Sequence, residues 1–569
     1  MGEFYYNEEQ ESYDAIVIGT GISGGWAAKE LCEKGLKTLI LERGRMVTHV
    51  EDYDTANLDD WDFPNAGEPT REQKANYPIQ SKVYQAAHAA NRKWFVNDLE
   101  HPYNQSKRFD WIRGYHVGGR SITWGRQSYR WSEADFTANK REGIAVDWPV
   151  RYNDIAPWYD KVESFIGVSG EKLGLPQLPD GQFEPEMELN CVENHLREQV
   201  AEHFNGRVIT SGRVAHINSD KQFEGRMRCQ FRNRCKRGCP FGAYFSSLSS
   251  TLPAAERTGN LTLRPDAIVH EIIYDPDTQK ATGVKVIDRV TKENYEFKAK
   301  VIFLCASTVG STSILLQSKS DRFPNGMGND SNQLGRNLMD HHIGAGARGI
   351  FEGFEDKYYK GRKPSAIYIP RFRNLNAKSD VNYKRGFGYQ GGASRTQYGE
   401  TIAEYAYGKD MKEALLKPGK WRMSLGGFGE ILPYEDNMMT LDYNTLDSWG
   451  LPTVTFNAEL RDNELTMRKD MRDSAAEMLK KAGFSQVKSY NRPYSMGRAI
   501  HEMGTARMGR DPNTSVLNGH NQIHAVKNVY VTDGSFMTSA SCVNPSLTYM
   551  AFTARAVDHA IKELKNGNI

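Results

Sequence analysis

The chain has 569 residues, of which 39% are hydrophobic and 25% charged, and its formal net charge is +2. This length is too great for one simple core, so two domains or one large discontinuous assembly are expected in a globular protein. The nearly neutral charge gives no electrostatic reason to expect nucleic acid or a membrane surface as a partner. No run of residues approaches the roughly 18 apolar residues of a membrane span.

A strand, a glycine-rich turn and a helix are predicted at the beginning of the chain. Ala15–Ile18 is a short apolar run rich in β-branched residues, which predicts a buried strand. Apolar residues then recur at helical spacing until Gly35 ends the helix. A second strand is predicted over Thr38–Leu41, and it is followed directly by Glu42.

Three glycines in this segment form the pattern G-x-G-x-x-G, at Gly19, Gly21 and Gly24. Glycines at these positions permit a tight turn and the close approach of a pyrophosphate, which lies at the helix N-terminus. Glu42, 18 residues after Gly24, can accept hydrogen bonds from ribose hydroxyls. The pattern therefore favours dinucleotide binding, and the alternative is a glycine-rich turn that serves packing alone.

The next part of the chain is irregular and rich in aromatic residues. Residues 51–104 predict a lid or binding loop, because long irregular segments in compact enzymes usually have that role. The stretch GYHVGGRSITWGRQSYRW follows at residues 114–131. Its adjacent Gly118 and Gly119 indicate a backbone that passes close to a flat group, with an ordinary glycine turn as the alternative.

The middle of the chain predicts a helix over Tyr152–Ile166 and then an antiparallel excursion. Its three or four strands are expected at Leu261–Leu263, Ala267–Tyr274, Thr282–Ile287 and Glu296–Lys298. A fully apolar strand, Val301–Leu304, leads through CASTVGS into a helix that begins near Thr312. This strand could return the chain to the parallel sheet that Ala15–Ile18 began.

A second, sheet-based domain is predicted from Gly344 to about residue 457, with loops such as 388–395 between its strands. Its strands are expected at Ala366–Ile369, Ser424–Leu432, Met438–Asp442 and Thr453–Phe456. A helix follows over Leu460–Leu479. The last predicted elements are a strand at Val529–Val531 and a helix at Asn544–Ala560.

Six motifs spread along the chain resemble those of one family in that family's order. They are the N-terminal fingerprint with ERG at 42–44, GGRSITW at 118–124, CASTVGS at 305–311, GRNLMDH at 335–341, HEMGTARMG at 501–509 and VTDGSFMTSASCVNPSLTYMAFTARA at 531–556. The family is the glucose–methanol–choline (GMC) oxidoreductases, which bind FAD. The resemblance implies an α/β fold with a Rossmann-like FAD domain and an inserted α+β substrate domain built on an antiparallel sheet.

The resemblance also implies a division of the chain into discontinuous domains. The FAD domain is expected from 10–50, 105–131, 225–343 and 500–566, the substrate domain from 132–224 and 344–499, and the lid from 51–104. The pyrophosphate is expected at the three glycines of the fingerprint, and the adenosine ribose at Glu42. The other expected cofactor contacts are Gly119, Ser121, Thr123, Val269, Ala306, Asp533, Gly534 and Thr548.

Some members of this family attach FAD covalently through a histidine in the glycine-rich motif. The corresponding position here is Thr123, which cannot form that bond, so FAD is expected to be held noncovalently.

The family's catalytic pair corresponds to His501 and Asn544, 43 residues apart. Oxidation of an alcohol requires removal of a hydroxyl proton, for which an imidazole is a suitable base. An amide can orient the hydroxyl without competing for the proton. The alternative role of His501 is a structural hydrogen bond, and His116, His341 and His342 are assigned structural roles by default.

Three of the seven cysteines are clustered, and the odd total argues against a disulfide framework. Cys229, Cys235 and Cys239 form C-x5-C-x3-C before a proline, within a basic loop at residues 226–242. Three thiolates do not complete a structural zinc site, but they can hold a three-iron cluster. The loop resembles that of bacterial FAD-dependent sugar dehydrogenases with a 3Fe–4S cluster, and the alternative is a basic surface loop with free thiols.

The resulting functional hypothesis is a flavin dehydrogenase that oxidises a pyranose hydroxyl and sends electrons through the cluster to a cytochrome c or quinone. The resemblance to glucoside 3-dehydrogenases favours C3 of a sugar or glycoside, with a 3-keto sugar as product. Alternatives within the family are a glucose 1-dehydrogenase, a sugar-acid dehydrogenase or an oxygen-using oxidase without a working cluster. A non-catalytic flavoprotein subunit is a further alternative, while the VTDGS and NPSLT motifs disfavour a NAD-dependent enzyme.

The first residues, MGEFYYNEEQESYD, are acidic and polar and do not form a secretory signal. The resemblance implies export to the periplasm with a small partner subunit that carries the signal, and a cytoplasmic location is the alternative.

Overall fold

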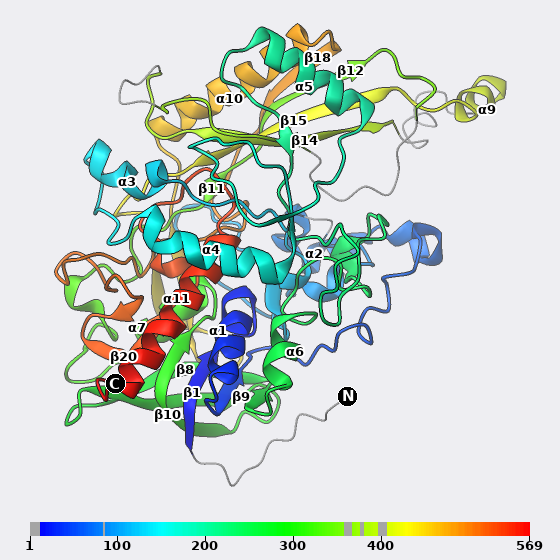
Figure 1. Ribbon diagram of the computed structural model, residues 1–569. Coiled ribbons are helices and arrows are strands. Elements are labelled where there is room, and N and C mark those ends of the chain that lie inside the picture. Colours follow the sequence, from blue (N-terminus) through cyan, green and yellow to red (C-terminus); the bar gives the residue numbers. More distant parts are fainter. Residues whose placement is uncertain (1–11, 84–85, 358–366, 376–380, 397–406) are drawn as a thin grey trace.

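The computed structural model describes residues 12–83, 86–357, 367–375, 381–396 and 407–569 (Figure 1). Its two large sheets lie at opposite ends of the molecule, and helices pack against both of them (Figure 1). The fold is therefore a mixed α/β structure, as predicted. Within the described part of the chain, none of the helices has both the length and the apolar composition that crossing a bilayer requires.

The first sheet has a parallel core of five strands in the order β20-β10-β1-β2-β7. These strands and the antiparallel strands at their margin are β1 (Ser12–Ile18), β2 (Thr38–Leu41), β7 (Leu261–Arg264), β8 (Ala267–Asp275), β9 (Lys280–Asp288), β10 (Asn294–Leu304), β19 (Gln522–Ile523) and β20 (Val526–Val531). Residues from both ends of the chain and its middle thus share one sheet. This arrangement confirms the predicted return of Val301–Leu304 to the sheet of Ala15–Ile18.

One strand, β10, takes part in both the parallel core and the antiparallel excursion. Its first part pairs antiparallel with β9, and its last part pairs parallel with β1. The two separate strands predicted within β10 are therefore one, because an 11-residue strand is long enough to reach both neighbours. The strand β7, predicted as part of the excursion, pairs instead with β2 in the parallel core.

Helices α1 (Ile22–Glu33), α6 (Thr251–Glu256) and α11 (Ser546–Lys565) lie together against the first sheet (Figure 1). Helix α4 (Tyr152–Ile166) packs on α11, and its Phe165 ring meets the edge of Trp26 at 5.3 Å. The segment that contains α4 was expected in the substrate domain, yet these contacts place the helix beside the dinucleotide fingerprint. Helix α7 (Thr308–Gln317) contacts β8.

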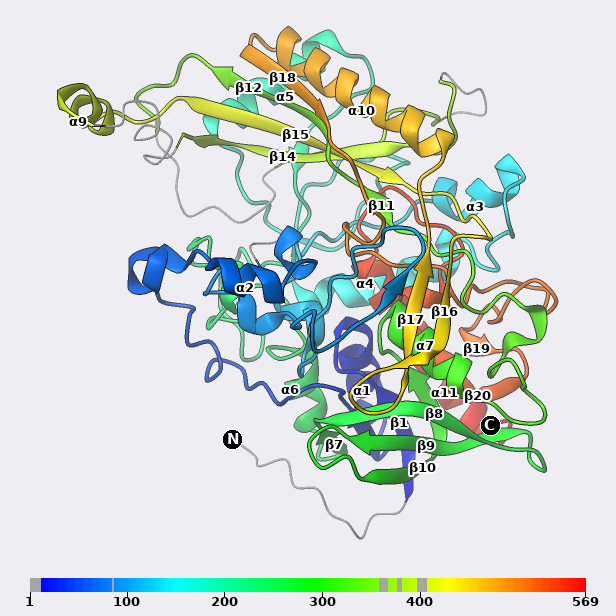
Figure 2. The same ribbon diagram turned by 180° about the vertical axis from the view of Figure 1, so that it is seen from behind.

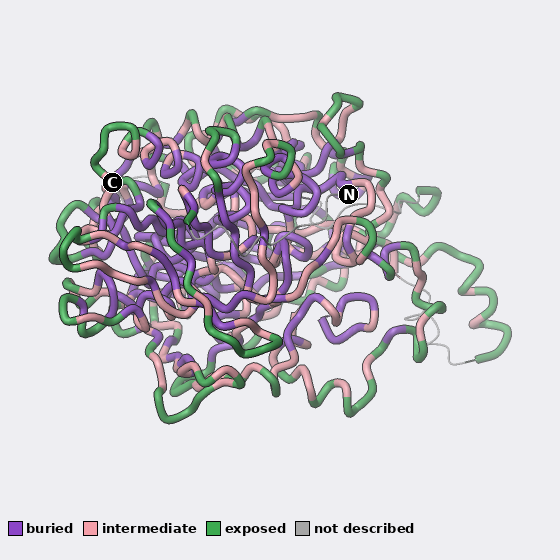
Figure 3. Tube along the Cα trace, turned by 90° about the horizontal axis from the view of Figure 1, so that it is seen from below, coloured by how far each residue is buried: buried purple, intermediate pink, exposed green. Residues whose placement is uncertain are grey.

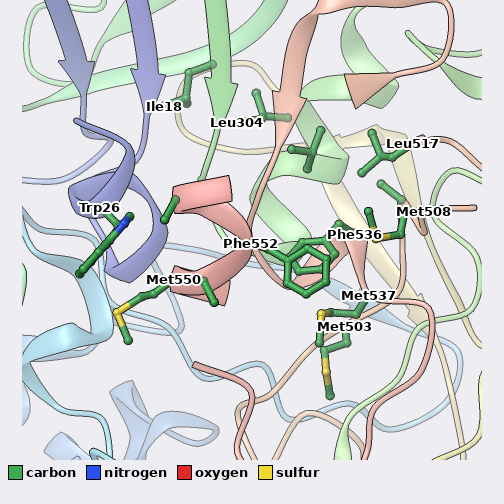
Figure 4. Packing of buried hydrophobic residues seen from close by; sticks show 14 of the residues in the cluster. Ile18, Trp26, Leu304, Met503, Met508, Leu517, Phe536, Met537, Met550 and Phe552 are labelled. Carbon is green, nitrogen blue, oxygen red and sulfur yellow. The ribbon is translucent and has the colours of Figure 1, made fainter. Parts of the chain in front are cut away.

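The main core joins these helices to the sheet. Ile18 and Leu304 face one another across neighbouring strands, and the Phe536 and Phe552 rings lie 4.7 Å apart (Figure 4). Buried residues fill the interior of the molecule, and exposed residues occupy its periphery (Figure 3). All seven cysteines are free thiols.

The second sheet has seven strands, and all of its strand pairs are antiparallel. They are β6 (Thr210–Ser211), β11 (His341–His342), β12 (Ala345–Phe351), β13 (Ile367–Ile369), β14 (Phe387–Arg395), β15 (Trp421–Glu430) and β18 (Ser485–Asn491). Helices α10 (Asp462–Lys481) and α5 (Cys191–His203) cover its outer face (Figure 1). The opposite face is turned toward the first sheet. Residue Ala366, the predicted beginning of β13, lies outside the described residues.

The prediction of a loop over residues 388–395 is wrong, because this segment is the strand β14. Its glycines fit it closely between its neighbours: a Cβ atom at Gly391 would lie 2.1 Å from the Ser424 carbonyl oxygen. At Gly388 it would lie 2.8 Å from the Tyr368 hydroxyl. The glycines therefore mark close backbone approach within a sheet rather than a turn.

A third sheet of three strands joins the lid to the substrate segment (Figure 2). It consists of β3 (Asn104–Gln105), β16 (Met438–Leu446) and β17 (Pro452–Asn457). The Phe456 ring stacks on Phe109 at 4.1 Å. The remaining short elements are α2 (Arg71–Asn76), α3 (Glu133–Glu142), α9 (Lys409–Leu415), β4 (Val168–Ser169) and β5 (Phe183–Glu184).

Candidate active site

A cavity of about 710 Å³ lies between the two large sheets. Its walls include Gly21 and Glu42 at the carboxyl ends of β1 and β2, and Gln390 and Gly426 from the second sheet. The crevice outside the carboxyl ends of parallel strands is where open α/β sheets bind ligands. The cavity therefore combines the fingerprint with the substrate segment in one site.

The three fingerprint glycines have different structural roles. Gly19 has φ +98°, and a Cβ atom at Gly24 would lie 1.7 Å from the Gly19 carbonyl oxygen, so both glycines are needed for the turn. A Cβ atom at Gly21 would meet no atom within 4 Å. Gly21 thus leaves open space at the N-terminus of α1, where a phosphate can approach backbone N–H groups.

Glu42 is buried at the end of β2 and lines the cavity. Its carboxylate accepts hydrogen bonds from the Thr20 backbone N–H at 3.1 Å, the Thr20 hydroxyl at 2.5 Å and the Gly44 N–H at 3.0 Å. Burial raises the pKa of Glu42, and these hydrogen bonds oppose the rise. A carboxylate has about four acceptor positions, so one remains for a ribose hydroxyl.

The glycine-rich motif lies directly beside the fingerprint, where the Gly118 N–H donates to the Thr20 hydroxyl at 2.9 Å. Gly118, with φ +84°, begins the 3-10 turn η5 (Gly119–Ile122). Gly119, Ser121 and Thr123 all line the cavity. These positions are consistent with the expected contact between this motif and the cofactor.

Asp533 and Gly534 line the cavity at the start of the 3-10 turn η8 (Gly534–Phe536). The Asp533 carboxylate accepts hydrogen bonds from the Ser535 N–H at 3.0 Å and from the Ser311 hydroxyl. A Cβ atom at Gly534 would lie 2.4 Å from the Glu502 carbonyl oxygen. These contacts connect the turn to the CASTVGS and HEMGTARMG motifs.

Val269 and Ala306 also line the cavity, whereas Thr548 does not belong to the described lining. Thr548 is fully buried on α11, and its hydroxyl lies 2.8 Å from that of Tyr159. Ser546 and Tyr549, from the same helix, line the cavity instead. A cofactor contact of Thr548 stays a prediction.

His501 and Asn544 both line the cavity, so the fold brings the predicted catalytic pair to one site. The His501 ring is held by His341, with 3.2 Å between the two Nδ1 atoms. The Asn544 Oδ1 accepts a hydrogen bond from Gln390 Nε2 at 2.7 Å. Because this oxygen is occupied, the Asn544 amide presents its NH₂ group to the cavity as a donor.

The sequence did not predict several residues of this site. Thr20 lies within the fingerprint and His341 within GRNLMDH, so both belong to recognised motifs. Gln390 lies outside these motifs, in a segment that was predicted to be a loop. Three residues of the predicted lid, Lys82, Val83 and Phe95, line the cavity. Their position agrees with the expectation of a binding loop over residues 51–104.

The three clustered cysteines line a second cavity of about 30 Å³ around the 3-10 turn η6 (Cys235–Arg237). The Cys229 sulfur accepts a hydrogen bond from the Phe231 N–H at 3.4 Å. Burial raises the pKa of Cys235, and the nearby Arg126 opposes the rise. Across the described residues, no group of three or more His, Cys, Asp or Glu side chains is arranged to hold a metal ion.

A buried arginine with unsatisfied N–H groups lies beside the three cysteines. Arg126 is fully buried beside the cysteines, with its guanidinium 3.9 Å from the Tyr244 ring centroid. Its Nε and Nη2 atoms have no hydrogen-bond partner in the described part of the chain. Buried N–H groups without partners are costly, so these two atoms call for an acceptor near the cysteines.

The basic loop is docked on the lid rather than free in solvent. Arg234 pairs with Asp59, and Arg237 pairs with Asp60 at 3.0 Å. Arg232 donates to the Asn57 side-chain oxygen at 2.9 Å. These pairs partly neutralise the positive charge that the sequence placed around the cysteines.

Family models described as GMC oxidoreductase match residues 13–343 and 433–553, which together span most of the chain. The chain belongs to the GMC oxidoreductase family. This finding confirms the resemblance carried by the six motifs. As a GMC oxidoreductase the chain binds FAD, and the open space at Gly21 and the hydrogen-bonded Glu42 fit that cofactor.

Three relatives of this GMC oxidoreductase match nearly its whole length. The 2-methyl-1,2-propanediol dehydrogenase of Mycolicibacterium austroafricanum is 27% identical, over 96% of this chain and 94% of the relative. The fructose dehydrogenase large subunit of Gluconobacter japonicus is 24% identical, over 99% of this chain and all of the relative. The paromamine 6'-oxidase of Streptomyces fradiae is 25% identical, over 96% of this chain and 91% of the relative.

Among solved structures, a formate oxidase of Aspergillus oryzae is similar with a TM-score of 0.63 at 15% identity. The similarity covers 98% of this chain and all of that one. At this identity the likeness concerns the fold alone, and it agrees with the predicted two-part architecture.

Proposed function

We propose that this GMC oxidoreductase oxidises a secondary hydroxyl of a pyranose sugar or glycoside. The observation that carries the proposal is the meeting of His501 and Asn544 in the cavity, each held from behind by a second side chain. Relatives named for sugars and aminoglycosides, the fructose dehydrogenase large subunit and the paromamine 6'-oxidase, support a carbohydrate substrate.

The two side chains have different roles toward the substrate hydroxyl. The Asn544 NH₂ group donates a hydrogen bond to the hydroxyl oxygen and orients it. The neutral His501 imidazole accepts the hydroxyl proton as the general base. FAD, when bound, accepts the hydride from the carbinol carbon. Glu502, the next residue after His501, is held in an ion pair with Arg120 at 3.2 Å.

The proton transfer is expected to persist at mildly acidic pH. Burial lowers the pKa of His501 well below its ordinary value, and His341 and Arg120 lower it further, so the base form survives below the ordinary titration range. We expect the rate of flavin reduction by sugar to stay constant from about pH 8 to about pH 6. A stopped-flow rate that falls by half near pH 6.5 would show instead that the imidazole titrates as it does in water.

We favour C3 of the sugar as the position of oxidation, on the basis of the motifs that resemble glucoside 3-dehydrogenases. Oxidation at C1 needs a free anomeric hydroxyl, whereas oxidation at C3 does not. Methyl glucoside should therefore bleach the bound flavin anaerobically about as well as glucose, and NMR should identify a 3-keto product. If methyl glucoside is inert and glucose gives a lactone, the enzyme acts at C1.

We also propose that Cys229, Cys235 and Cys239 hold a 3Fe–4S cluster, which would be the exit for electrons. Lys236, next to Cys235, lines the larger cavity, so the cysteine loop adjoins the flavin site. The unsatisfied N–H groups of Arg126 support an anionic group between the three thiolates.

Cys235→Ser is expected to abolish the EPR signal of an oxidised three-iron cluster while sugar still reduces the flavin. Turnover with a cytochrome-like acceptor should fall, because the cluster acts after the chemical step. Cys191→Ser, outside the loop, is the matched control. It should change neither the EPR signal nor the turnover with the acceptor. Full turnover of iron-free protein with that acceptor would contradict the cluster. Rapid peroxide production by iron-free protein would instead favour an oxidase.

The electron acceptor and the location of the enzyme follow from the same proposal. We propose a cytochrome c or quinone acceptor and export to the periplasm with a small partner subunit. The name of the fructose dehydrogenase large subunit indicates a partner for that relative. Co-purification of a signal-bearing small subunit would support this location, and activity confined to the cytoplasm would contradict it.

A further inference from the structure

His341 lies directly behind the proposed base. It belongs to β11, which pairs with β15 of the second sheet, and its side chain is fully buried. It is not among the described residues that line the cavity, so it has no direct route to a substrate. Its expected role from the sequence was structural, but its hydrogen bonds point to a more specific one.

The two nitrogens of His341 have different partners. Nε2 lies 3.0 Å from the Ser541 carbonyl oxygen, which can only accept, so Nε2 carries the hydrogen. A neutral imidazole has one N–H group, and the His341 Nδ1 is therefore an acceptor. It lies 3.2 Å from the His501 Nδ1, which must then be the donor.

The surroundings keep both rings neutral. Burial lowers the pKa of His341 to about 3, and the Phe428 ring packs on it at 4.6 Å. Asp340 directly precedes His341, but one of its oxygens accepts the backbone N–H groups of His341 and His501, at 2.8 and 3.1 Å. Its other oxygen accepts the Tyr494 hydroxyl at 2.8 Å. The carboxylate is thus satisfied without either imidazole.

Other charged groups around the pair do not compete for the imidazole nitrogens. Arg120 pairs with Glu502, and Arg468 donates to the carbonyl oxygens of Ile343 and Arg492, each at 2.6 Å. Neither imidazole is bound to an acid in the described structure. The tautomer of His501 is therefore determined by His341.

We propose that His341 is a positioning residue that holds His501 as the Nδ1–H tautomer. The lone pair of His501 then lies on Nε2, on the side of the ring away from His341, ready for the substrate hydroxyl. After the proton moves from the hydroxyl to Nε2, the resulting imidazolium still donates its Nδ1–H to His341. This inference rests on the proposed function, in which His501 is the base.

Two substitutions separate this role from simple packing. His341→Asn retains a carbonyl oxygen near the position of Nδ1 and can accept from His501. His341→Leu fills similar space without any acceptor. We expect His341→Leu to reduce the rate of flavin reduction by about 10–100-fold, as for other partners that orient a functional imidazole. His341→Asn should stay within a few-fold of the unaltered holoenzyme.

A spectroscopic measurement tests the tautomer without relying on activity. The holoenzyme is labelled with ¹⁵N-histidine, and the His501 signals among the 14 histidines are identified by their loss in His501→Ala. The expected ¹⁵N shifts show a protonated Nδ1 and an unprotonated Nε2. In His341→Leu the signals should move toward the Nε2–H tautomer, and in His341→Asn they should not.

The possible results are distinct. A protonated Nε2 on His501 in the unaltered holoenzyme overturns the proposal, even if His341→Leu does not fold. Unchanged rates in both His341 variants, with His501→Ala impaired, also overturn it but leave the proposed function intact. If His501→Ala reduces its flavin normally, the proposed function itself fails.

Discussion

His501→Ala is expected to lower the rate of flavin reduction by the preferred sugar by about 10²–10⁴-fold, the range for loss of a general base. The substitution removes the proposed proton acceptor at the cavity wall and leaves the fingerprint, the proposed pyrophosphate site, unchanged. FAD should therefore remain bound at full occupancy. Anaerobic stopped-flow absorbance and the flavin content of the purified protein measure the two quantities.

Asn544→Ala provides the matched comparison within the same pair. It removes the donor that orients the hydroxyl but leaves the base in place, so its effect on flavin reduction should be smaller. Bleaching of the flavin by sugar at an unchanged rate in His501→Ala would refute the role of His501 as base. Equal losses in both variants would assign the two residues one joint role in binding.

Gly24→Ala is expected to prevent assembly of the FAD site. The added Cβ atom would lie 1.7 Å from the Gly19 carbonyl oxygen, a rigid backbone atom that cannot move without breaking the turn. Overpacking of this kind costs about 1–3 kcal/mol or more of the free energy of unfolding. The protein should be obtained without FAD and with a lowered melting temperature.

Gly21→Ala is the control, because it adds the same methyl group at a glycine three residues earlier in the chain. A Cβ atom at Gly21 meets nothing within 4 Å and Gly21 has negative φ, so the protein should fold with a melting temperature close to that of the apoenzyme. The methyl group would occupy the space left for the pyrophosphate, and the affinity for FAD should fall. Normal FAD content and stability in Gly24→Ala would contradict the assignment of this turn.

The sequence predicted those elements whose pattern is local. The βαβ fingerprint, the helices α4 and α11 and the strands β2 and β17 follow from apolar periodicity bounded by glycines, and the structure confirms them. The proposed catalytic pair was predicted from separate motifs, and the fold brings its two residues to one cavity.

Several features that depend on distant neighbours were not predicted. The glycines of β14 have the composition of a loop, and only the backbones beside them in the second sheet explain their position. The roles of His341 and Gln390 are set by hydrogen bonds to residues more than 150 positions away. No local pattern encodes such contacts.

The strand order of the first sheet has a consequence for biosynthesis. β1 is made first, but its neighbour β10 follows about 280 residues later, and β20 pairs with β10 only near the end of the chain. Asp533, the proposed base His501 and Asn544 all belong to about the last 70 residues of the chain. Contacts between such distant segments form slowly, because the intervening chain must first be ordered. On the ribosome, the cofactor pocket therefore closes only after almost the entire polypeptide has emerged, and FAD is captured as a late, post-translational step.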